Sequence, residues 1–336
     1  MNMKRWLALG AAVVLLVFSI GLNTVMAIFT TNFFSNFDSI MSTEQEVSEN
    51  VLEPGDFNKR IALLSVDGTI QDVGSSSPWS TVEYDHQNFL AQLDTILNDN
   101  TVKAVVLVVD SPGGGVIESA EIHKKLLEIK EKREIPIYVS MGSMAASGGY
   151  YISAPADKIF AHRETLTGSI GVIMQSYNFS ELAENIGIKF ETIKSGAHKD
   201  MFGGTRPTTE EEKAMLQEMI NDSYEVFVDV VEQGRGMSEA QVKKVADGRV
   251  LGGSQALKAG LVDELGRLED AIASIRADYD LEDAELFEYE TGFGDFTSLI
   301  GMKIGSFFGP SPEERMLTKL MSSYDAPRMM YLYGEY

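Results

Sequence analysis

An almost wholly apolar run at residues 102–109, Val-Lys-Ala-Val-Val-Leu-Val-Val, sets the strongest limit on how this chain can fold. A strand with one face in water alternates apolar and polar residues, whereas a strand that is apolar at nearly every position is covered on both faces. Such strands occur in parallel sheets with helices packed on either side. The run therefore predicts an α/β fold with a mostly parallel sheet and flanking helices.

Strand and helix patterns alternate along the rest of the chain. Further strands are predicted at 60–66, 136–140, 158–161 and 190–193, and helices at 89–97, 120–132 and 209–231. Loops rich in small residues follow the strands at 110–115, 141–149, 165–171 and 195–200. In sheets of this kind, sites gather at the carboxyl ends of the strands. We therefore expect the four loops to converge.

The N-terminus carries an apolar segment, residues 6–22, which continues more weakly to residue 29. Its length matches a helix that crosses roughly 30 Å of hydrocarbon. Lys4 and Arg5 precede it and acidic residues follow, so the positive-inside rule predicts a single-pass anchor with a cytoplasmic N-terminus and an extracytoplasmic body. The alternative is a signal peptide cleaved after Val25-Met26-Ala27. Residues 30–55, rich in Thr, Ser, Asn and Glu, are predicted to form a linker.

Composition excludes several kinds of chemistry and partner. The net charge of −22, from 50 acidic and 28 basic residues, argues against nucleic acid and against flat docking on anionic lipid headgroups. The chain has no cysteine, which excludes thiol chemistry and disulfides, and it has only four histidines. No cofactor or metal site is expected.

Ser147 and Lys199 are the residues that we expect to carry the chemistry. A serine hydroxyl is a weak nucleophile until a base takes its proton, and a lysine can be that base only where its surroundings favour the neutral amine. Ser147 lies among alanines and glycines, where a substrate backbone can approach closely. The plainer interpretation is a small-residue turn packed on the sheet, with Lys199 as a solvated lysine. The alternative bases are His198, with Asp200 two residues on, and His162.

The Gly113–Gly115 loop can present backbone N–H groups to a substrate, because glycine permits unusual φ angles and close approach. Beside Ser147, such donors would stabilise a tetrahedral oxyanion, and the Gly148 N–H is the natural second donor. A tight turn remains an alternative. A dinucleotide glycine fingerprint fails because Glu118 stands where a glycine is needed. Ser169, between two glycines, could orient the lysine.

These motifs in this order resemble the signal peptide peptidase A family in its short, single-repeat bacterial form. The resemblance runs over about residues 59–275 and includes Asp110–Gly115, Met144–Tyr150, Thr167–Gly171 and Ser195–Asp200, with 248–251 and 256–263 further on. It implies a Clp-protease/crotonase-like fold and a membrane-anchored homo-oligomeric serine peptidase whose active sites lie near subunit contacts. The implied substrates are remnant signal peptides and other apolar peptides at the outer face of the cytoplasmic membrane.

The resemblance also implies a role for each motif residue. Ser147 would be the nucleophile and Lys199 the general base, Ser169 would orient the lysine, and Gly114 and Gly148 would be the oxyanion donors. Two alternatives stay open: a non-catalytic peptide-binding membrane scaffold and an acyl-thioester enzyme of the crotonase type. The presence of both Ser147 and Lys199 argues against the scaffold. Export counts against the acyl-thioester enzyme because coenzyme A is cytoplasmic.

The predicted organisation is an anchor (1–29), a linker (30–55), a serine peptidase domain (56–295) and a C-terminal tail (296–336). The tail is predicted to contain a short helix at 313–321 and to end in an apolar, aromatic stretch, which is unusual for a free terminus in so acidic a protein. Either this end packs on its own or a neighbouring subunit as ordinary structure, or it lies in the substrate groove as an extended peptide.

Overall fold

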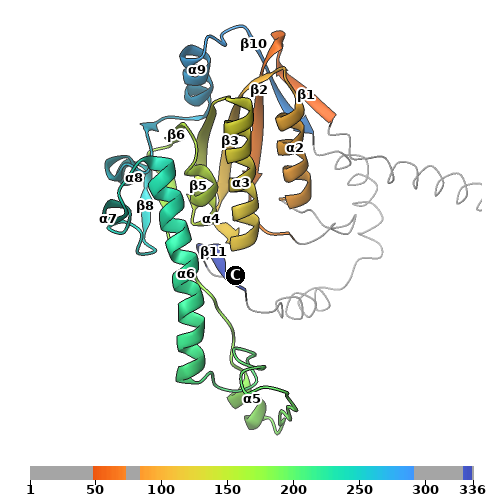
Figure 1. Cartoon of the computed structure of the whole chain (residues 1–336), viewed down its shortest axis with the longest axis vertical. Helices are drawn as coiled ribbons and strands as arrows, with labels where there is room; N and C mark the ends of the chain where they lie inside the picture. The colour runs from red at the N-terminus through yellow and green to blue at the C-terminus, as the bar shows by residue number, and fades with distance from the viewer. Residues whose placement is uncertain (1–47, 73–83, 291–327, 335–336) are drawn as a thin grey trace, which may run out of the picture. The chain divides into compact units, whose positions relative to one another are not determined.

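A computed structural model describes residues 48–72, 84–290 and 328–334 (Figure 1). Within this part, nine strands form one sheet with the order β1-β10-β2-β3-β5-β6-β9, and β7 and β8 extend it beside β5. The strands of this sheet are β1 Ser48–Glu53, β2 Asp56–Asp67, β3 Val102–Ser111, β5 Ile137–Ala146, β6 Lys158–Ala161, β7 Leu166–Gly168, β8 Val250–Gly252, β9 Glu264–Leu265 and β10 Ala284–Glu290.

The sheet is mostly parallel, as predicted from the apolar run in β3. β3 lies between β2 and β5 and is parallel to both, while β1 pairs with β10 and β8 with β7 in antiparallel register. Alternate residues of β3 enter two separate apolar cores, with Val105 and Leu107 in one and Ala104 and Val106 in the other. Both faces of the strand are therefore covered, which explains why nearly every position is apolar.

Helices cover both faces of the sheet. One core contains side chains of α2, α3, α4 and α6, and the other contains side chains of α9. Figure 1 shows α2 and α3 side by side over the first face. The helices are α2 His86–Asn98, α3 Val116–Arg133, α4 Gly148–Ser153, α5 Ser180–Asn185, α6 Glu210–Arg235, α7 Glu239–Val242, α8 Gly253–Ala259 and α9 Leu268–Asp278.

The end of the predicted linker belongs to the sheet, because residues 48–53 form β1. Arg60 of β2, only 2% exposed, explains this attachment. Its guanidinium pairs with Glu49 of β1, with Glu285 of β10 at 3.0 Å and with Asp99 at 3.3 Å. A buried cation needs such partners, so three acidic residues from separate segments gather around it.

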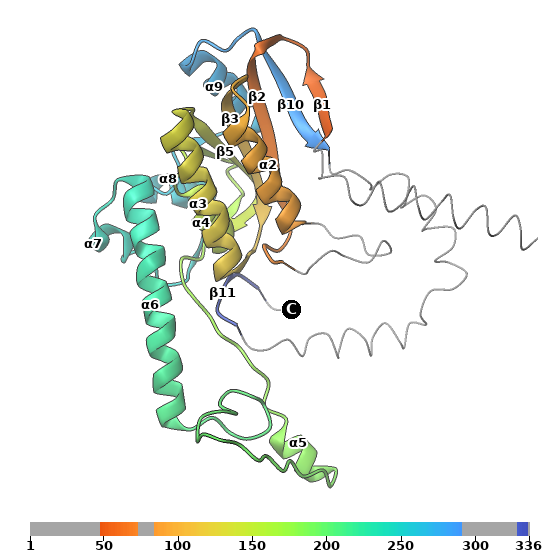
Figure 2. The same cartoon turned by 45° about the vertical axis from the view of Figure 1, so that its right-hand side comes forward.

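The predicted strand at 190–193 is wrong. These residues, which follow α5, form no strand, and Phe190 and Ile193 are exposed. A strand needs a neighbour to share its backbone hydrogen bonds, and none of the described residues supplies one. The helix predicted at 209–231 is confirmed as α6, which begins at a Thr209 capping box with Glu212. Figures 1 and 2 show α5 and the segment that leads into α6 at the end of α6 that lies far from α8.

The C-terminal segment forms β11 (Met330–Leu332), which pairs antiparallel with β4 (Gly113–Gly115). Met330 also exchanges two backbone hydrogen bonds with Ile173, of 3.0 and 2.9 Å. β11 therefore lies between two segments of the domain, β4 and the segment of Ile173 (Figure 2). The predicted anchor (1–29), residues 30–47 and the predicted helix at 313–321 lie outside the described residues. Within residues 48–72, 84–290 and 328–334, no helix has both the length and the apolar character that a membrane crossing needs.

Candidate active site

Ser147 lies where β5 ends and α4 begins. Its backbone has φ 53° and ψ −115°, a conformation that few residues other than glycine adopt. The Ser147 N–H donates to the Gly168 carbonyl at 2.8 Å, which ties this sharp turn to the end of β7. Ser147 is 1% exposed, and its Oγ has no hydrogen-bond partner among the described residues. A strained strand-to-helix turn with an unpaired hydroxyl is typical of a nucleophile.

The two predicted oxyanion donors, Gly114 and Gly148, lie close together beside this turn. A β-carbon added to Gly148 would lie 3.1 Å from the Gly114 nitrogen and 2.7 Å from Ser119 Oγ. A β-carbon added to Gly114 would meet the Ile70 carbonyl oxygen at 1.9 Å. Glycine is therefore required at 114 to let β4 pass close to Ile70, and this packing fixes the direction of the Gly114 N–H.

The Tyr331 carbonyl of β11 lies at these two glycines. Its oxygen is 3.1 Å from the position that a β-carbon on Gly148 would take. Tyr331 stands opposite Gly114 in the ladder. Since Met330 turns its N–H and C=O towards Ile173, the alternation of a strand turns those of Tyr331 towards Gly114. The segment thus presents a peptide carbonyl at the two predicted oxyanion donors. Residues 328–334 pack on the domain of their own chain, and the identity of this place as a substrate groove stays a prediction.

The Tyr331 side chain fills an aromatic pocket behind this point and is fully buried. Its ring stacks on Tyr151 of α4 at 4.9 Å and contacts Phe227 of α6 at 4.7 Å, measured between centroids. Its hydroxyl donates to the Ser223 carbonyl at 3.0 Å. His123 of α3 closes the pocket edge-on to Tyr151 at 5.2 Å, and burial lowers the pKa of His123 to about 4.

Ser169 lies beside Ser147, because Gly168 pairs with Ala146 in the β5–β7 ladder. It is 6% exposed, has φ 50°, and its N–H donates to the Arg249 carbonyl at 2.8 Å. The structure thus brings the predicted nucleophile, both predicted oxyanion donors and the predicted lysine-orienting serine to one place.

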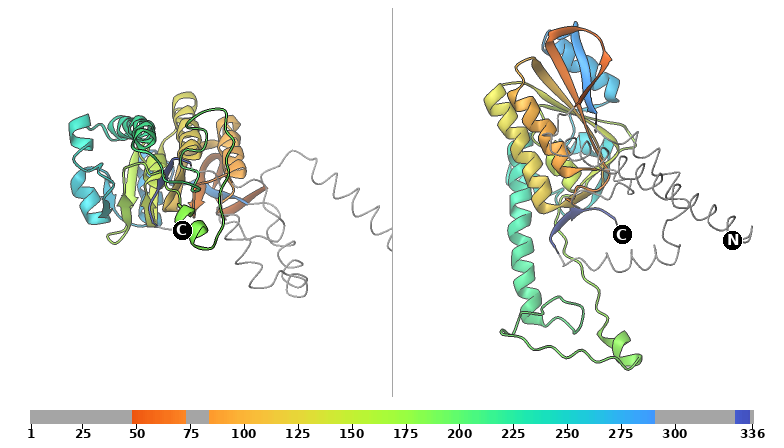
Figure 3. Two further views of the ribbon diagram at one scale, coloured as in Figure 1. Left: turned by 90° about the horizontal axis from the view of Figure 1, so that it is seen from below. Right: turned by 90° about the vertical axis from the view of Figure 1, so that its right-hand side faces the viewer.

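Lys199 is not part of this cluster within one chain. It is exposed, in the segment between α5 and α6, and it makes no hydrogen bond to Ser147, whose Oγ is unpaired. The predicted convergence of all four loops therefore fails for the fourth. The right-hand view of Figure 3 shows that segment well below the body of the domain that carries α3. The long α6 separates the two because it projects beyond the sheet.

Ion pairs order the segment that carries Lys199. Arg206 reaches Asp200 at 2.6 Å and Glu212 at 2.5 Å, and Lys194 reaches Asp200 at 2.6 Å. The Arg206 guanidinium is the main cause that holds the pKa of Asp200 and that of Glu212 well below their usual range. Asp200 is thus engaged by cations and does not pair with His198.

Neither alternative base reaches Ser147. His198 Nδ1 lies 3.4 Å from Glu212 Oε1, and His162 is exposed with its Nδ1 accepting from the Glu164 N–H at 3.2 Å. Within the described residues, no group of three or more His, Asp or Glu side chains is arranged to hold a metal ion.

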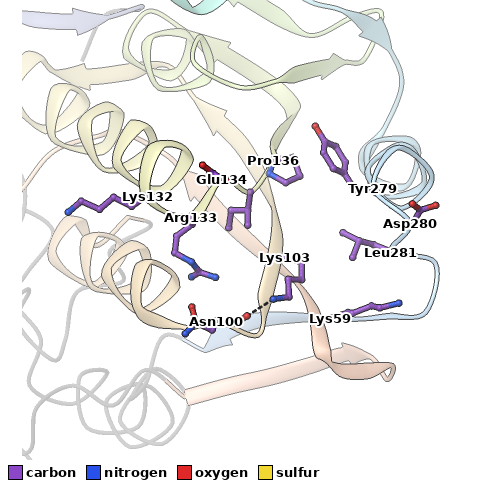
Figure 4. A pocket seen from close by; sticks show the side chains of 11 residues that line it. Lys59, Asn100, Lys103, Lys132, Arg133, Glu134, Pro136, Tyr279, Asp280 and Leu281 are labelled. Carbon is purple, nitrogen blue, oxygen red and sulfur yellow. Dashed lines mark hydrogen bonds between the residues drawn. The ribbon is translucent and has the colours of Figure 1, made fainter.

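A cavity elsewhere is unrelated to this chemistry. It lies at the amino ends of β3 and β5 and is lined by basic side chains that include Lys59, Lys103 and Arg133 (Figure 4). Each of these is engaged: Lys59 with Asp283, Lys103 with the Asn100 carbonyl and Arg133 with three backbone carbonyls. The cluster around Ser147 lies at the opposite, carboxyl ends of the same strands.

Comparison with known proteins assigns the family. Residues 129–282, which include Ser147, Ser169 and Lys199, match peptidase family S49. A protein of Enterococcus faecium named as a candidate signal peptide peptidase is 44% identical over 347 residues, with 99% of each chain covered. The chain belongs to the signal peptide peptidase A family.

This family member is a serine protease, and its similarity to other proteases is broad. A protein of Methanocaldococcus jannaschii named as a candidate protease is 39% identical over 67% of this chain and 73% of its own. Protease 4 of Haemophilus influenzae is 33% identical over 84% of this chain and 48% of its own.

Two features of the site were missed from the sequence. The aromatic pocket joins residues from α3, α4 and α6 with the C-terminus, and only their spatial packing reveals it. In the sequence, Glu118 is only a misfit to a glycine fingerprint, although it lies in the first turn of α3 and accepts a hydrogen bond from Arg328. An acidic residue just after a glycine loop was the available signal.

Proposed function

We propose that this protein is a membrane-anchored serine endopeptidase that cleaves remnant signal peptides and other apolar peptides with a Ser147/Lys199 dyad. One observation carries the proposal: the Tyr331 carbonyl lies at Gly114 and Gly148, next to the unpaired Ser147 hydroxyl. An extended peptide that binds in the same way as β11 presents one carbonyl to the Ser147 hydroxyl and to the N–H groups of Gly114 and Gly148.

The reaction follows from this arrangement. The neutral Lys199 amine takes the Ser147 hydroxyl proton as Oγ attacks the carbonyl carbon, and the oxyanion that forms accepts hydrogen bonds from Gly114 and Gly148 N–H. The C–N bond then breaks, and the leaving amine takes the proton from the lysine. Water, deprotonated by the same lysine, hydrolyses the acyl-serine and returns the free hydroxyl.

The groove suits extended apolar peptides. A substrate adds as a strand between β4 and the Ile173 segment, so backbone hydrogen bonds hold it regardless of sequence. The aromatic pocket of Tyr151 and Phe227 then selects a large apolar side chain at the residue that donates the attacked carbonyl. Signal peptides, whose central region is apolar, offer such residues.

Lys199 acts on Ser147 of a neighbouring protomer in this proposal. In its own chain the lysine is exposed and separated from the serine, and a base of this kind needs a buried setting. Exposed apolar side chains precede it in the sequence, and a second copy of the chain would cover them. They are Tyr177, Leu182, Ile186, Ile188, Phe190 and Ile193. On assembly, Ser169 would receive the lysine amine beside Ser147.

The predicted anchor places this activity at the outer face of the cytoplasmic membrane, where signal peptides remain after preprotein cleavage. Residues 1–29 supply the anchor, and the Enterococcus faecium relative is named for signal peptides.

Product analysis by mass spectrometry tests the proposal. The full chain is incubated with a set of synthetic signal peptides and with polar peptides of equal length. We expect internal cuts after large apolar residues in the signal peptides alone, and none with Ser147→Ala or Lys199→Ala. Cleavage that survives Ser147→Ala in a purified, folded sample would refute the mechanism.

A further inference from the structure

Arg328 lies three residues before Tyr331 and is bound by the domain. Its Nη1 donates to Glu118 Oε1 at 3.2 Å, and its Nη2 donates to Gln71 Oε1 at 2.8 Å. Met330 pairs with Gly115, so continuing the antiparallel register by two residues carries Arg328 over the first turn of α3, where Glu118 stands. The contact follows from the strand register and recurs for any peptide bound in the same way.

Glu118 is held in place by groups other than Arg328. Its Oε1 also accepts the Asp72 N–H at 3.2 Å, and the residue is 8% exposed. A β-carbon on Gly115 would meet Glu118 Oε2 at 1.8 Å, so the glycine makes room for the carboxylate to lie along β4. The carboxylate is thus pre-positioned at the edge of the groove, which reduces the entropic cost of binding a cation.

The surroundings of Glu118 are acidic. Burial and the nearby carboxylates of Asp85, Glu118 and Asp72 raise the pKa of Tyr84. The whole protein carries a net charge of −22, so a basic peptide end is drawn towards this surface. The Glu121 carboxylate, one turn further along α3, instead pairs with His86 Nε2 at 2.9 Å.

We propose that Glu118 and Gln71 form a subsite that selects peptides with an arginine three positions before the residue whose carbonyl is attacked. Two acceptors on separate segments match the forked guanidinium, whereas a lysine amine reaches them less well. Signal peptides carry basic residues directly before their apolar region. The subsite therefore directs the first cut to the start of the apolar region. This inference rests on the proposed function for its chemistry.

Competition between two peptides in one reaction tests the subsite. One has the sequence of residues 326–334, and the other has glutamine at the arginine position. Because both compete for the same sites, the ratio of their kcat/KM values is independent of how often the chain's own tail fills the groove. We expect the full chain to prefer the arginine peptide about tenfold, as for a charge-assisted hydrogen bond at a half-exposed site.

Three variants separate recognition from structure. E118Q keeps the acceptor for the Asp72 N–H and should reduce the preference to about twofold or less. Gln71→Met should lower it about threefold and remove the advantage of arginine over lysine. E121Q, the matched control, removes a neighbouring charge and should leave most of the preference. A wild-type ratio near one, or a ratio that E118Q leaves unchanged, overturns the proposal.

A binding arm keeps the test independent of catalysis. Fluorescein-labelled versions of both peptides are titrated with the full-length Ser147→Ala chain, alone and combined with E118Q, and anisotropy reports binding. Tighter binding of the arginine peptide that E118Q abolishes supports the subsite even if no peptide is cleaved, in which case only the proposed function fails. Equal binding of the two peptides contradicts the subsite directly.

Discussion

The backbone at Ser147, with φ 53°, stores strain of about 1–3 kcal/mol at the point where the chemistry would occur. The hydrogen bond to Gly168 and the packing of α4 hold this conformation. At the scale of single residues, the candidate site is therefore a hydroxyl fixed in a tight turn, with Gly114 and Gly148 close beside it. Each of these parts makes its own prediction.

We predict that Ser147→Ala and Lys199→Ala each lower peptide hydrolysis by about 10³-fold or more, because each removes a partner of the same proton transfer. His198→Ala and His162→Ala should keep most of the activity, since neither imidazole reaches Ser147.

The rate of peptide hydrolysis should also rise through mildly alkaline pH, because a lysine base must be neutral. Initial rates from pH 6 to 10 measure this, and inactivity of a folded histidine variant would point to a Ser/His mechanism.

Gly114→Ala should lower kcat by roughly 10²–10³-fold. The added β-carbon would meet the Ile70 carbonyl oxygen at 1.9 Å, so β4 must shift and its N–H turns away from the oxyanion. Steady-state kinetics measures the loss. Gly260→Ala is a matched control, because a β-carbon there meets nothing within 4 Å and the residue lies outside the Lys199 segment, although its φ of 77° makes the change costly for stability. Unchanged kcat in Gly114→Ala would remove this N–H from the mechanism.

At the scale of elements, β11 occupies the groove that substrates would use. It forms a ladder with β4, exchanges hydrogen bonds with Ile173 and places Tyr331 in the aromatic pocket. The tail therefore resembles a bound substrate, and the Tyr331 carbonyl is the one that Ser147 would attack. The same elements, α3, α4 and α6, build the pocket wall.

We predict that active protein removes its own last residues. Attack at the Tyr331 carbonyl would release residues 332–336, and the product would end at Tyr331. Intact-mass measurement of the full chain should show this loss over hours, while Ser147→Ala keeps every residue. Equal masses for the two proteins would mean that the tail binds without being cleaved.

The pocket wall also predicts a pH dependence of stability through His123. Burial lowers its pKa to about 4 from 6.5, so between these values the unfolded chain binds more protons than the folded one. The contribution of His123 to the free energy of unfolding should therefore fall as pH decreases from about 6.5 to about 4 and level off below, by on the order of 1–2 kcal/mol. Urea unfolding of wild type and His123→Gln measures it, and parallel pH curves for both would contradict the assignment.

At the scale of the whole molecule, one chain does not bring the two residues of the predicted dyad together. Ser147, Ser169 and the oxyanion donors lie in the domain, whereas Lys199 lies on an exposed segment with apolar neighbours. A second copy of the chain would supply the lysine and cover those apolar side chains. In that arrangement, only the assembled oligomer would be active.

Mixing two inactive variants tests this arrangement. Ser147→Ala and Lys199→Ala subunits, dissociated and reassembled together, should recover part of the activity, because some contacts pair an intact serine with an intact lysine. Recovery should peak near an equal ratio, and each variant reassembled alone is the control. Mixed oligomers that stay inactive at every ratio would place the dyad within one chain.

The sequence by itself determined the mostly parallel α/β architecture and singled out Ser147, Ser169 and the two glycines that the structure brings together. The apolar pattern of β3 required cover on both faces, and the small residues around Ser147 allowed a sharp turn that only a few side chains tolerate. These are local properties, which spacing and residue type encode directly. The family likewise followed from the order of its motifs.

Only the tertiary structure decided how distant segments meet. The strand predicted at 190–193 had a suitable pattern but no described partner, and β1 joined the sheet because the buried Arg60 required acidic partners. The position of Tyr331 beside Gly114 depends on the register of two segments that are more than 200 residues apart. The same register brings Arg328 to Glu118, which are 210 residues apart. Pairing partners and registers arise from packing across the whole molecule, so no local pattern specifies them.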